Sequence, residues 1–165
     1  MAAWDKDSGD VYQVETDLKL AMIMLVLTDQ KKPVSSRDGM KLCTETSTSF
    51  PEWIKQSEQD YKDMLGYLKT NDFQAVGALT EANALRMHQT TSTANPPFSY
   101  LTDASYQAMD KVKALRASGE QCYFTMDAGP NVKVLCLEED LDRLADHFRK
   151  DYQVIVSRTK ELPDA

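Results

Sequence analysis

The chain has 165 residues, of which 42% are apolar and 27% charged, so it is long enough to bury the core of one ordinary domain. Its formal net charge of −7 argues against a general nucleic-acid-binding surface, which needs basic side chains to neutralise phosphates. The longest apolar run, Leu20 to Leu27, is too short to span a bilayer, and the first residues carry no targeting signal.

The three cysteines, Cys43, Cys122 and Cys136, have neither an even count nor the spacing of a metal site. Two of them lie inside apolar, strand-like runs, where a free thiol behaves as a small hydrophobic side chain. We therefore expect a reducing, cytoplasmic location and no metal ligands in this chain. From its length, we expect a single domain over residues 1–165.

The first part of the chain predicts two extended runs and a helix. Residues 11–14 and 18–27 have the apolar content of strands, and the second run is almost wholly apolar, as in a central strand. A helix is expected to begin at Ser35 or Ser36, because Asp38 follows Ser35 at the third position, as in a capping box.

Two long helices are predicted in the middle of the chain. Ser49 and Glu52 have the spacing of a second capping box, and the helix that they begin should end near Asn71. Asp72 can cap the next helix, whose apolar pattern stops at the polar segment that starts at Gln89.

The last part of the chain returns to strands. A further helix is expected from about Thr102 or Asp103, ended by Gly119, and it is followed by two strand-like runs on either side of Asp127. A helix from about Glu138 and a last strand through residues 154–156 complete the pattern.

The predicted order of elements defines the fold class. Strand, several helices, strand, turn, strand, helix and strand is the split βαβ or ferredoxin-like plan with an enlarged first crossover. We therefore predict an α+β fold in which helices cover one face of an antiparallel sheet. Because this fold hosts many unrelated functions, the function has to be argued from individual residues.

The segment between residues 122 and 135 sets one carboxylate at the mouth of a tight turn. Asp127 is followed by Gly129, which allows close approach of backbone or ligand, Pro130, which fixes φ, and Asn131, which tolerates unusual dihedrals. A general base would be held still in this position. Since any hairpin turn prefers the same residue types, a purely structural turn stays open as the alternative.

A second candidate site lies at the predicted helix start. The backbone N–H groups and the dipole of a helix favour anions there, and the Arg37 guanidinium can donate two parallel hydrogen bonds to phosphate. Ser36 and Arg37 are therefore candidates for binding a diphosphate, although Asp38 would repel it. The alternative is a solvated cap with an exposed arginine. We interpret His88, near the end of a helix, as structural.

Three segments carry a resemblance to a known family. The runs 34–40, 81–88 and 122–135 resemble the carboxy-terminal half of bacterial mevalonate diphosphate decarboxylases, which belong to the GHMP kinase superfamily. The resemblance implies a GHMP-type carboxy-terminal domain in which Asp127 is the catalytic base and Ser36 and Arg37 bind the substrate diphosphate. In the implied reaction, ATP phosphorylates the tertiary hydroxyl of mevalonate diphosphate, then phosphate and carbon dioxide leave, and isopentenyl diphosphate remains.

The resemblance covers the chain from Ala3 or Trp4 onward, whereas proteins of this family are about twice as long. No glycine-rich phosphate loop is present, so ATP and Mg²⁺ are expected to be bound mainly by an amino-terminal half that this sequence lacks. The implied partners are mevalonate diphosphate and ATP, without nucleic acid or membrane, and a homodimer is compatible with the resemblance. We expect the isolated chain to be inactive.

Two alternatives remain open at this point. The chain can be the carboxy-terminal half of another GHMP-family small-molecule kinase, although such kinases would carry a different glycine-rich stretch where Asp127 stands. It can also be a stand-alone ferredoxin-like module that holds an anion at Ser36 and Arg37 without turnover.

Overall fold

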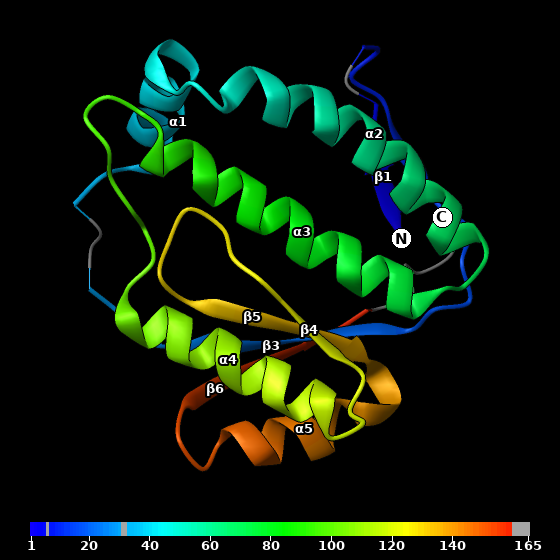
Figure 1. The fold of residues 1–165 in the computed structure, drawn as a ribbon. Coiled ribbons are helices and arrows are strands. Elements are labelled where there is room, and N and C mark those ends of the chain that lie inside the picture. The colour runs from blue at the N-terminus through cyan, green and yellow to red at the C-terminus, as the bar shows by residue number, and fades with distance from the viewer. Residues whose placement is uncertain (6, 31–32, 160–165) are drawn as a thin grey trace.

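A four-stranded antiparallel sheet forms the centre of the computed structural model, which describes residues 1–5, 7–30 and 33–159 (Figure 1). Its strands are β3 (Leu20–Val26), β4 (Cys122–Thr125), β5 (Val132–Leu137) and β6 (Gln153–Arg158), in the order β4-β5-β3-β6. All neighbouring pairs are antiparallel. This arrangement confirms the predicted α+β class and the ferredoxin-like plan.

The helices fill the two crossovers of this plan. The segment between β3 and β4 holds α1 (Ser36–Thr46), α2 (Phe50–Lys69), α3 (Phe73–Ser92) and α4 (Asp103–Ala117). Between β5 and β6, the 3₁₀ turn η1 (Glu138–Asp140) leads into α5 (Leu141–Phe148). Helices α4 and α5 are the pair that a plain split βαβ unit requires, and α1 to α3 are the enlargement of its first crossover.

A small second sheet lies near the amino terminus, where β1 (Ala2–Trp4) pairs with β2 (Val11–Gln13). The extended run predicted over residues 11–14 is therefore confirmed. We did not predict β1, because three residues are too few to show an alternating apolar pattern.

Helices α4 and α5 cover one face of the sheet and close the larger part of the core (Figure 1). Successive side chains of a strand point to opposite faces, so every second residue of β3, β4 and β5 is directed into this layer. The largest fully buried side chains of this layer are Phe124, Phe148, Ile23, Leu25, Leu141 and Leu144.

The opposite face is also covered, by the end of α2 and the first turns of α3 (Figure 1). The predicted helical cover of one face is thus confirmed, and the structure adds a second helical layer that we did not predict. Most of the intervening residues of the strands are apolar too, and leaving them in water would cost about 25 cal/mol per Å² of apolar surface. The residues that meet in this second layer are Val14, Leu20, Leu68, Phe73, Val76, Tyr123 and Leu135.

The caps predicted at Ser35 and Asp72 form as expected. The Ser35 hydroxyl accepts a hydrogen bond from the backbone N–H of Asp38 at 3.1 Å, and the Asp72 carboxylate accepts one from Ala75 at 3.0 Å. Thr102 caps α4 in the same way. Each such bond satisfies a backbone N–H that has no partner inside the helix.

The second capping box, predicted at Ser49 and Glu52, is wrong. Ser49 has helical dihedrals, with φ −94° and ψ −7°, and its hydroxyl contacts that of Thr93 at 2.7 Å instead of capping α2. Thr93 follows α3, which continues past the predicted stop at Gln89 as far as Ser92. A contact between segments distant in the sequence therefore replaces the local cap.

Glu81 of α3 links the helices to the edge strand β4. Its carboxylate accepts hydrogen bonds from the Arg116 guanidinium at 2.7 and 3.1 Å and from the Phe124 N–H at 2.9 Å. Arg116 also donates to the Cys122 carbonyl at 2.9 Å and lies over the Tyr123 ring, 4.7 Å from its centroid. Hydrogen bonding to Glu81 raises the pKa of Arg116. The carboxylate thus pairs an edge-strand N–H that has no neighbouring strand.

We expect Glu81→Gln to lower the free energy of unfolding by about 2 kcal/mol, because a half-buried arginine loses its charged partner. Urea denaturation of the chain measures this value. Glu15→Gln, at an exposed carboxylate, is the matched control and should change stability by less than about 0.5 kcal/mol. Equal losses in the two variants would contradict the role given to Glu81.

Candidate active site

The Asp127 turn, defined here as residues 126–131, joins the end of β4 to the start of β5. Met126 is buried in the core, whereas the Asp127 side chain is 72% exposed. The Gly129 N–H donates to the Asp127 carbonyl at 2.7 Å, and a Cβ at Gly129 would lie 3.5 Å from Asp127 Oδ1. The turn therefore presents an accessible carboxylate on a buried anchor, as a general base requires.

The side chain of Asn131 fastens this turn to the end of β3. Its Oδ1 accepts hydrogen bonds from the N–H groups of Leu27 at 2.8 Å and Thr28 at 3.1 Å, and its Nδ2 donates to the Thr28 carbonyl at 3.2 Å. The Pro130 carbonyl accepts a further bond, at 2.7 Å, from the buried hydroxyl of Ser105 in α4. Local sequence predicts a turn here, but only the structure assigns these partners.

We expect Asn131→Ala to lower the free energy of unfolding by about 2 kcal/mol, since three hydrogen bonds worth roughly 0.5–1.5 kcal/mol each are lost. The backbone amides of Leu27 and Thr28 should exchange with deuterium faster than in the unchanged chain. Asn131→Asp keeps the acceptor oxygen and should have the smaller effect. Unchanged exchange in Asn131→Ala would contradict this account of the turn.

Lys133 is a member of the site that is not among the residues predicted from the sequence. It lies in β5 opposite Met24 and Thr125, and its Nζ is 2.9 Å from Asp127 Oδ2. The sequence did carry a signal, because a charged residue interrupts the apolar run from Val132 to Leu135. This ion pair orients the carboxylate toward the β5 side of the turn.

Ser36 and Arg37 lie where the sequence predicts them, as the first two residues of α1, and both are exposed. The Asp38 carboxylate accepts a hydrogen bond from the Ser35 hydroxyl at 2.6 Å, so it is turned back toward the cap. Anion binding by Ser36 and Arg37 stays a prediction.

His88 lies against the Asp127 turn, although we interpret it from the sequence as structural. Its side chain is 7% exposed, and neither ring nitrogen has a hydrogen-bond partner within the described part of the chain. Burial lowers the pKa of His88, while the backbone and the carboxylate of Asp127 act in the opposite direction. The contact joins two distant segments, so no local pattern could have predicted it.

Lowering the pH should destabilise the fold through His88. An unfolded histidine titrates near pH 6.5, and the buried ring has a lower pKa, so the unfolded chain binds more protons as the pH falls below about 6.5. Stability present at pH 7 is therefore lost progressively down to the folded pKa, with a slope of at most about 1.4 kcal/mol per pH unit for one proton.

Urea denaturation between pH 5 and 7.5 tests this pH dependence. We expect His88→Gln to flatten the slope more than His147→Gln, whose imidazole is less buried. A slope in His88→Gln equal to that of the unchanged chain would show that another group is responsible.

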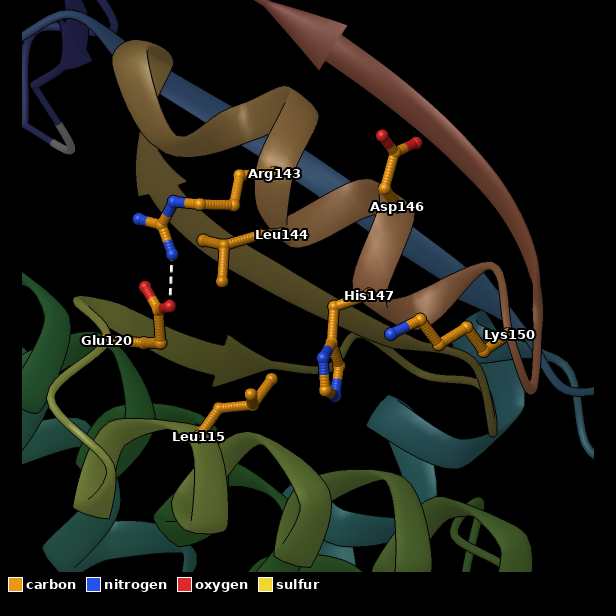
Figure 2. Close-up of a pocket in the computed structure, with 7 residues that line it drawn as sticks. All are labelled: Leu115, Glu120, Arg143, Leu144, Asp146, His147 and Lys150. Carbon is orange, nitrogen blue, oxygen red and sulfur yellow. Dashed lines mark hydrogen bonds and ion pairs between the residues drawn. The ribbon is translucent and has the colours of Figure 1, made fainter.

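A pocket of about 240 Å³ lies between α4 and α5 (Figure 2). Figure 2 shows that its wall is mostly charged, with Arg143 ion-paired to Glu120 and the His147 imidazole pointing toward Leu115. Burial and the nearby lysines, Lys111 and Lys150, lower the pKa of His147. None of the predicted site residues lines this pocket, so we place it outside the candidate active site.

A second pocket, of about 390 Å³, lies between α2, α3 and the end of β4 and adjoins the turn through Met126. Its polar part is the buried Asp60 carboxylate, which pairs with Arg86 and accepts a hydrogen bond from Asn83 at 2.8 Å. Burial alone would raise the pKa of Asp60, but hydrogen bonds from Asn83, Gln56 and Arg86 outweigh it. The carboxylate is thus already fully paired.

Within residues 1–5, 7–30 and 33–159, no group of three or more His, Cys, Asp or Glu side chains could hold a metal ion. In the same ranges, no helix is long and apolar enough to cross a membrane.

Comparisons with known proteins identify the family. Residues 22–163 match the family model described as Mevalonate 5-diphosphate decarboxylase C-terminal domain. Among curated proteins, the diphosphomevalonate decarboxylase of Rattus norvegicus is 32% identical over 147 residues, which cover 87% of this chain and 37% of the rat protein. Because the family model matches most of the chain, the chain belongs to this family, and the resemblance noted in the sequence is confirmed.

Solved structures agree in fold over nearly the whole chain. The mevalonate pyrophosphate decarboxylase of Streptococcus pyogenes is 70% identical, with a TM-score of 0.96, over 99% of this chain and 52% of that one. A structure described as MDDEF in complex with MVAPP, AMPPCP and magnesium is 41% identical, with a TM-score of 0.83, over 88% of this chain and 46% of that one. The chain thus spans about half the length of these structural relatives.

Proposed function

We propose that this chain supplies the carboxy-terminal part of an ATP-dependent decarboxylase that converts mevalonate diphosphate to isopentenyl diphosphate, ADP, phosphate and carbon dioxide. The observation that carries the proposal is an accessible carboxylate, Asp127, on a firmly held turn in a chain of the mevalonate diphosphate decarboxylase family. The names of the relatives support the same activity. In isolation the chain is proposed to be inactive, because it covers only about half of its solved relatives and 37% of the rat protein.

Asp127 is proposed to act as the general base. A carboxylate within hydrogen-bond reach of the tertiary hydroxyl of the substrate orients it and accepts its proton while the oxygen takes the γ-phosphoryl group of ATP. The bond between the tertiary carbon and the phosphorylated oxygen then breaks, and phosphate leaves with its electron pair. The electron pair of the carbon–carboxylate bond forms the double bond, and carbon dioxide leaves. A fixed negative charge beside the carbon favours this step, since positive charge develops there.

Ser36 and Arg37 are proposed to bind the substrate diphosphate. Both are exposed at the start of α1, and the Arg37 guanidinium can donate two parallel hydrogen bonds to phosphate oxygens. In a chain with a net charge of −7, a diphosphate has to be held by such a local group of donors.

ATP is proposed as co-substrate with Mg²⁺, which would neutralise phosphate charge during transfer. The described residues hold no cluster of metal-ligating side chains, and the sequence has no phosphate-binding glycine loop. We therefore assign both mainly to the part of the longer relatives that this chain does not cover. A cytoplasmic location is supported by three buried, unpaired cysteines.

The test is ATP-dependent release of labelled carbon dioxide from carboxyl-labelled mevalonate diphosphate. The chain is joined to the amino-terminal segment of the S. pyogenes protein that it does not cover, which gives the joined enzyme. We expect turnover by the joined enzyme and none by the chain alone. Asp127→Asn should lower kcat by about 10²–10⁴-fold, the usual contribution of a general base.

Asp110→Asn is a matched control for this substitution. Asp110 is 73% exposed and pairs with Lys113 at 3.0 Å, much as Asp127 pairs with Lys133, but it lies on α4. It should leave kcat unchanged. Absence of carbon dioxide release from a folded, ATP-binding joined enzyme would overturn the proposed function, and phosphorylation of mevalonate diphosphate without decarboxylation would favour a kinase.

A further inference from the structure

Tyr100, in the connection between α3 and α4, joins the start of α1 to the body of the domain. Its side chain is buried, and its hydroxyl donates a hydrogen bond to the carbonyl of Ser35 at 2.9 Å. Burial raises the pKa of Tyr100, so the hydroxyl keeps its proton and remains a donor. Ser35 immediately precedes Ser36 and Arg37, so this bond holds the segment to which diphosphate binding is assigned.

Gly39 shows how closely Tyr100 approaches α1. A Cβ added at Gly39 would lie 2.0 Å from the Tyr100 hydroxyl oxygen and 3.1 Å from the Phe98 ring. Only a residue without a side chain therefore allows this contact. Phe98 and Tyr100 also pack edge to face, with ring centroids 5.3 Å apart.

His88 connects Tyr100 to the Asp127 turn. The two rings pack edge to face, with centroids 6.4 Å apart, and the other surroundings of the imidazole include the backbone and carboxylate of Asp127. His88 is buried, and neither ring nitrogen makes a hydrogen bond of normal geometry among the described residues, while the backbone of Asp127 lies near enough to act on the imidazole pKa.

The far end of α1 is anchored to the residues that directly follow α3. The Ser47 hydroxyl contacts that of Thr93 at 2.7 Å, and the Thr46 hydroxyl accepts a hydrogen bond from the Asn95 N–H at 2.8 Å. Both ends of α1 therefore contact the segment that follows α3, residues 93–100.

We propose that Tyr100 and His88 are positioning residues that fix the start of α1 at a set distance and angle from the Asp127 turn. The inference rests on the proposed function, since a single substrate must reach the base with its hydroxyl and Arg37 with its diphosphate. A displacement of about 1 Å between two such groups can cost on the order of 10²-fold in rate.

Kinetics of the joined enzyme test the proposal. Tyr100→Phe removes one hydrogen bond and keeps the ring, so it should raise the KM for mevalonate diphosphate by roughly 2- to 10-fold and leave the KM for ATP unchanged. Tyr106→Phe, at a half-exposed tyrosine of α4, should change neither value. A purely structural role would lower the amount of active enzyme, and hence apparent kcat, without moving either KM.

Gly39→Ala gives an independent route to the same displacement, because the new methyl group pushes the Tyr100 hydroxyl away. Gly66→Ala is its control, since a Cβ at Gly66 of α2 meets nothing within 4 Å. We expect Gly39→Ala to raise the KM for mevalonate diphosphate, and to do so far less in a Tyr100→Phe background, where the clashing oxygen is missing. Additive effects on this KM in the double variant would contradict the inference that the Gly39→Ala methyl group acts through the Tyr100 hydroxyl.

Nuclear magnetic resonance of the isolated chain separates this proposal from the proposed function. Tyr100→Phe should shift the amide signals of Ser36 and Arg37 and the ring signals of His88, while those of His147, the other histidine, stay in place. If the unchanged joined enzyme does not turn over, the proposed function is wrong. The signal shifts then still test whether Tyr100 links the start of α1 to His88. Unmoved Ser36, Arg37 and His88 signals, or an unmoved KM for mevalonate diphosphate in Tyr100→Phe, would overturn the positioning role.

Discussion

Burial of β3 on both faces is the constraint on which the rest of the structure depends. Helices α4 and α5 pack on one side of this strand, and α2 and α3 with the amino-terminal segment pack on the side of Leu20. Because β3 also pairs with a strand at each edge, its end is a fixed point in the domain. The three hydrogen bonds of Asn131 attach the Asp127 turn to that point. A carboxylate can thus be exposed and still be held in place.

The site is open in this domain. Asp127 is 72% exposed, and an electrostatic effect on a developing charge is weak while water surrounds the carboxylate. The proposed second role of Asp127, stabilising positive charge as phosphate leaves, therefore needs a cover that excludes water. The domain by itself is therefore proposed to hold a base without turnover.

Most of the fold could be predicted from the sequence because it is encoded locally. Interactions between residues close in the sequence determine several of its features. These are the apolar run of β3, the caps at Ser35 and Asp72, and the turn residues around Asp127. The errors arose where distant segments meet. The Ser49 hydroxyl contacts Thr93 instead of capping α2. The helices on the second face of the sheet are placed by packing between elements, which no single element specifies. His88 comes near Asp127 only after folding, so local patterns could not assign it to the site, whereas the charge of Lys133 inside an apolar run was a local signal that we did not use.

Nitrogen-15 relaxation of the backbone amides tests most directly whether the Asp127 turn is held rigid before any substrate binds. We expect order parameters at Asp127 to Asn131, except at Pro130, of about 0.85, as in β4 and β5, because Asn131 and Ser105 fasten the β5 end of the turn and the buried Met126 anchors its β4 end. The exposed turn at Asp7 to Gly9 provides an internal comparison and should be more mobile. Values below about 0.6 at Asp127 and Ala128 would contradict the claim that the fold itself fixes the carboxylate.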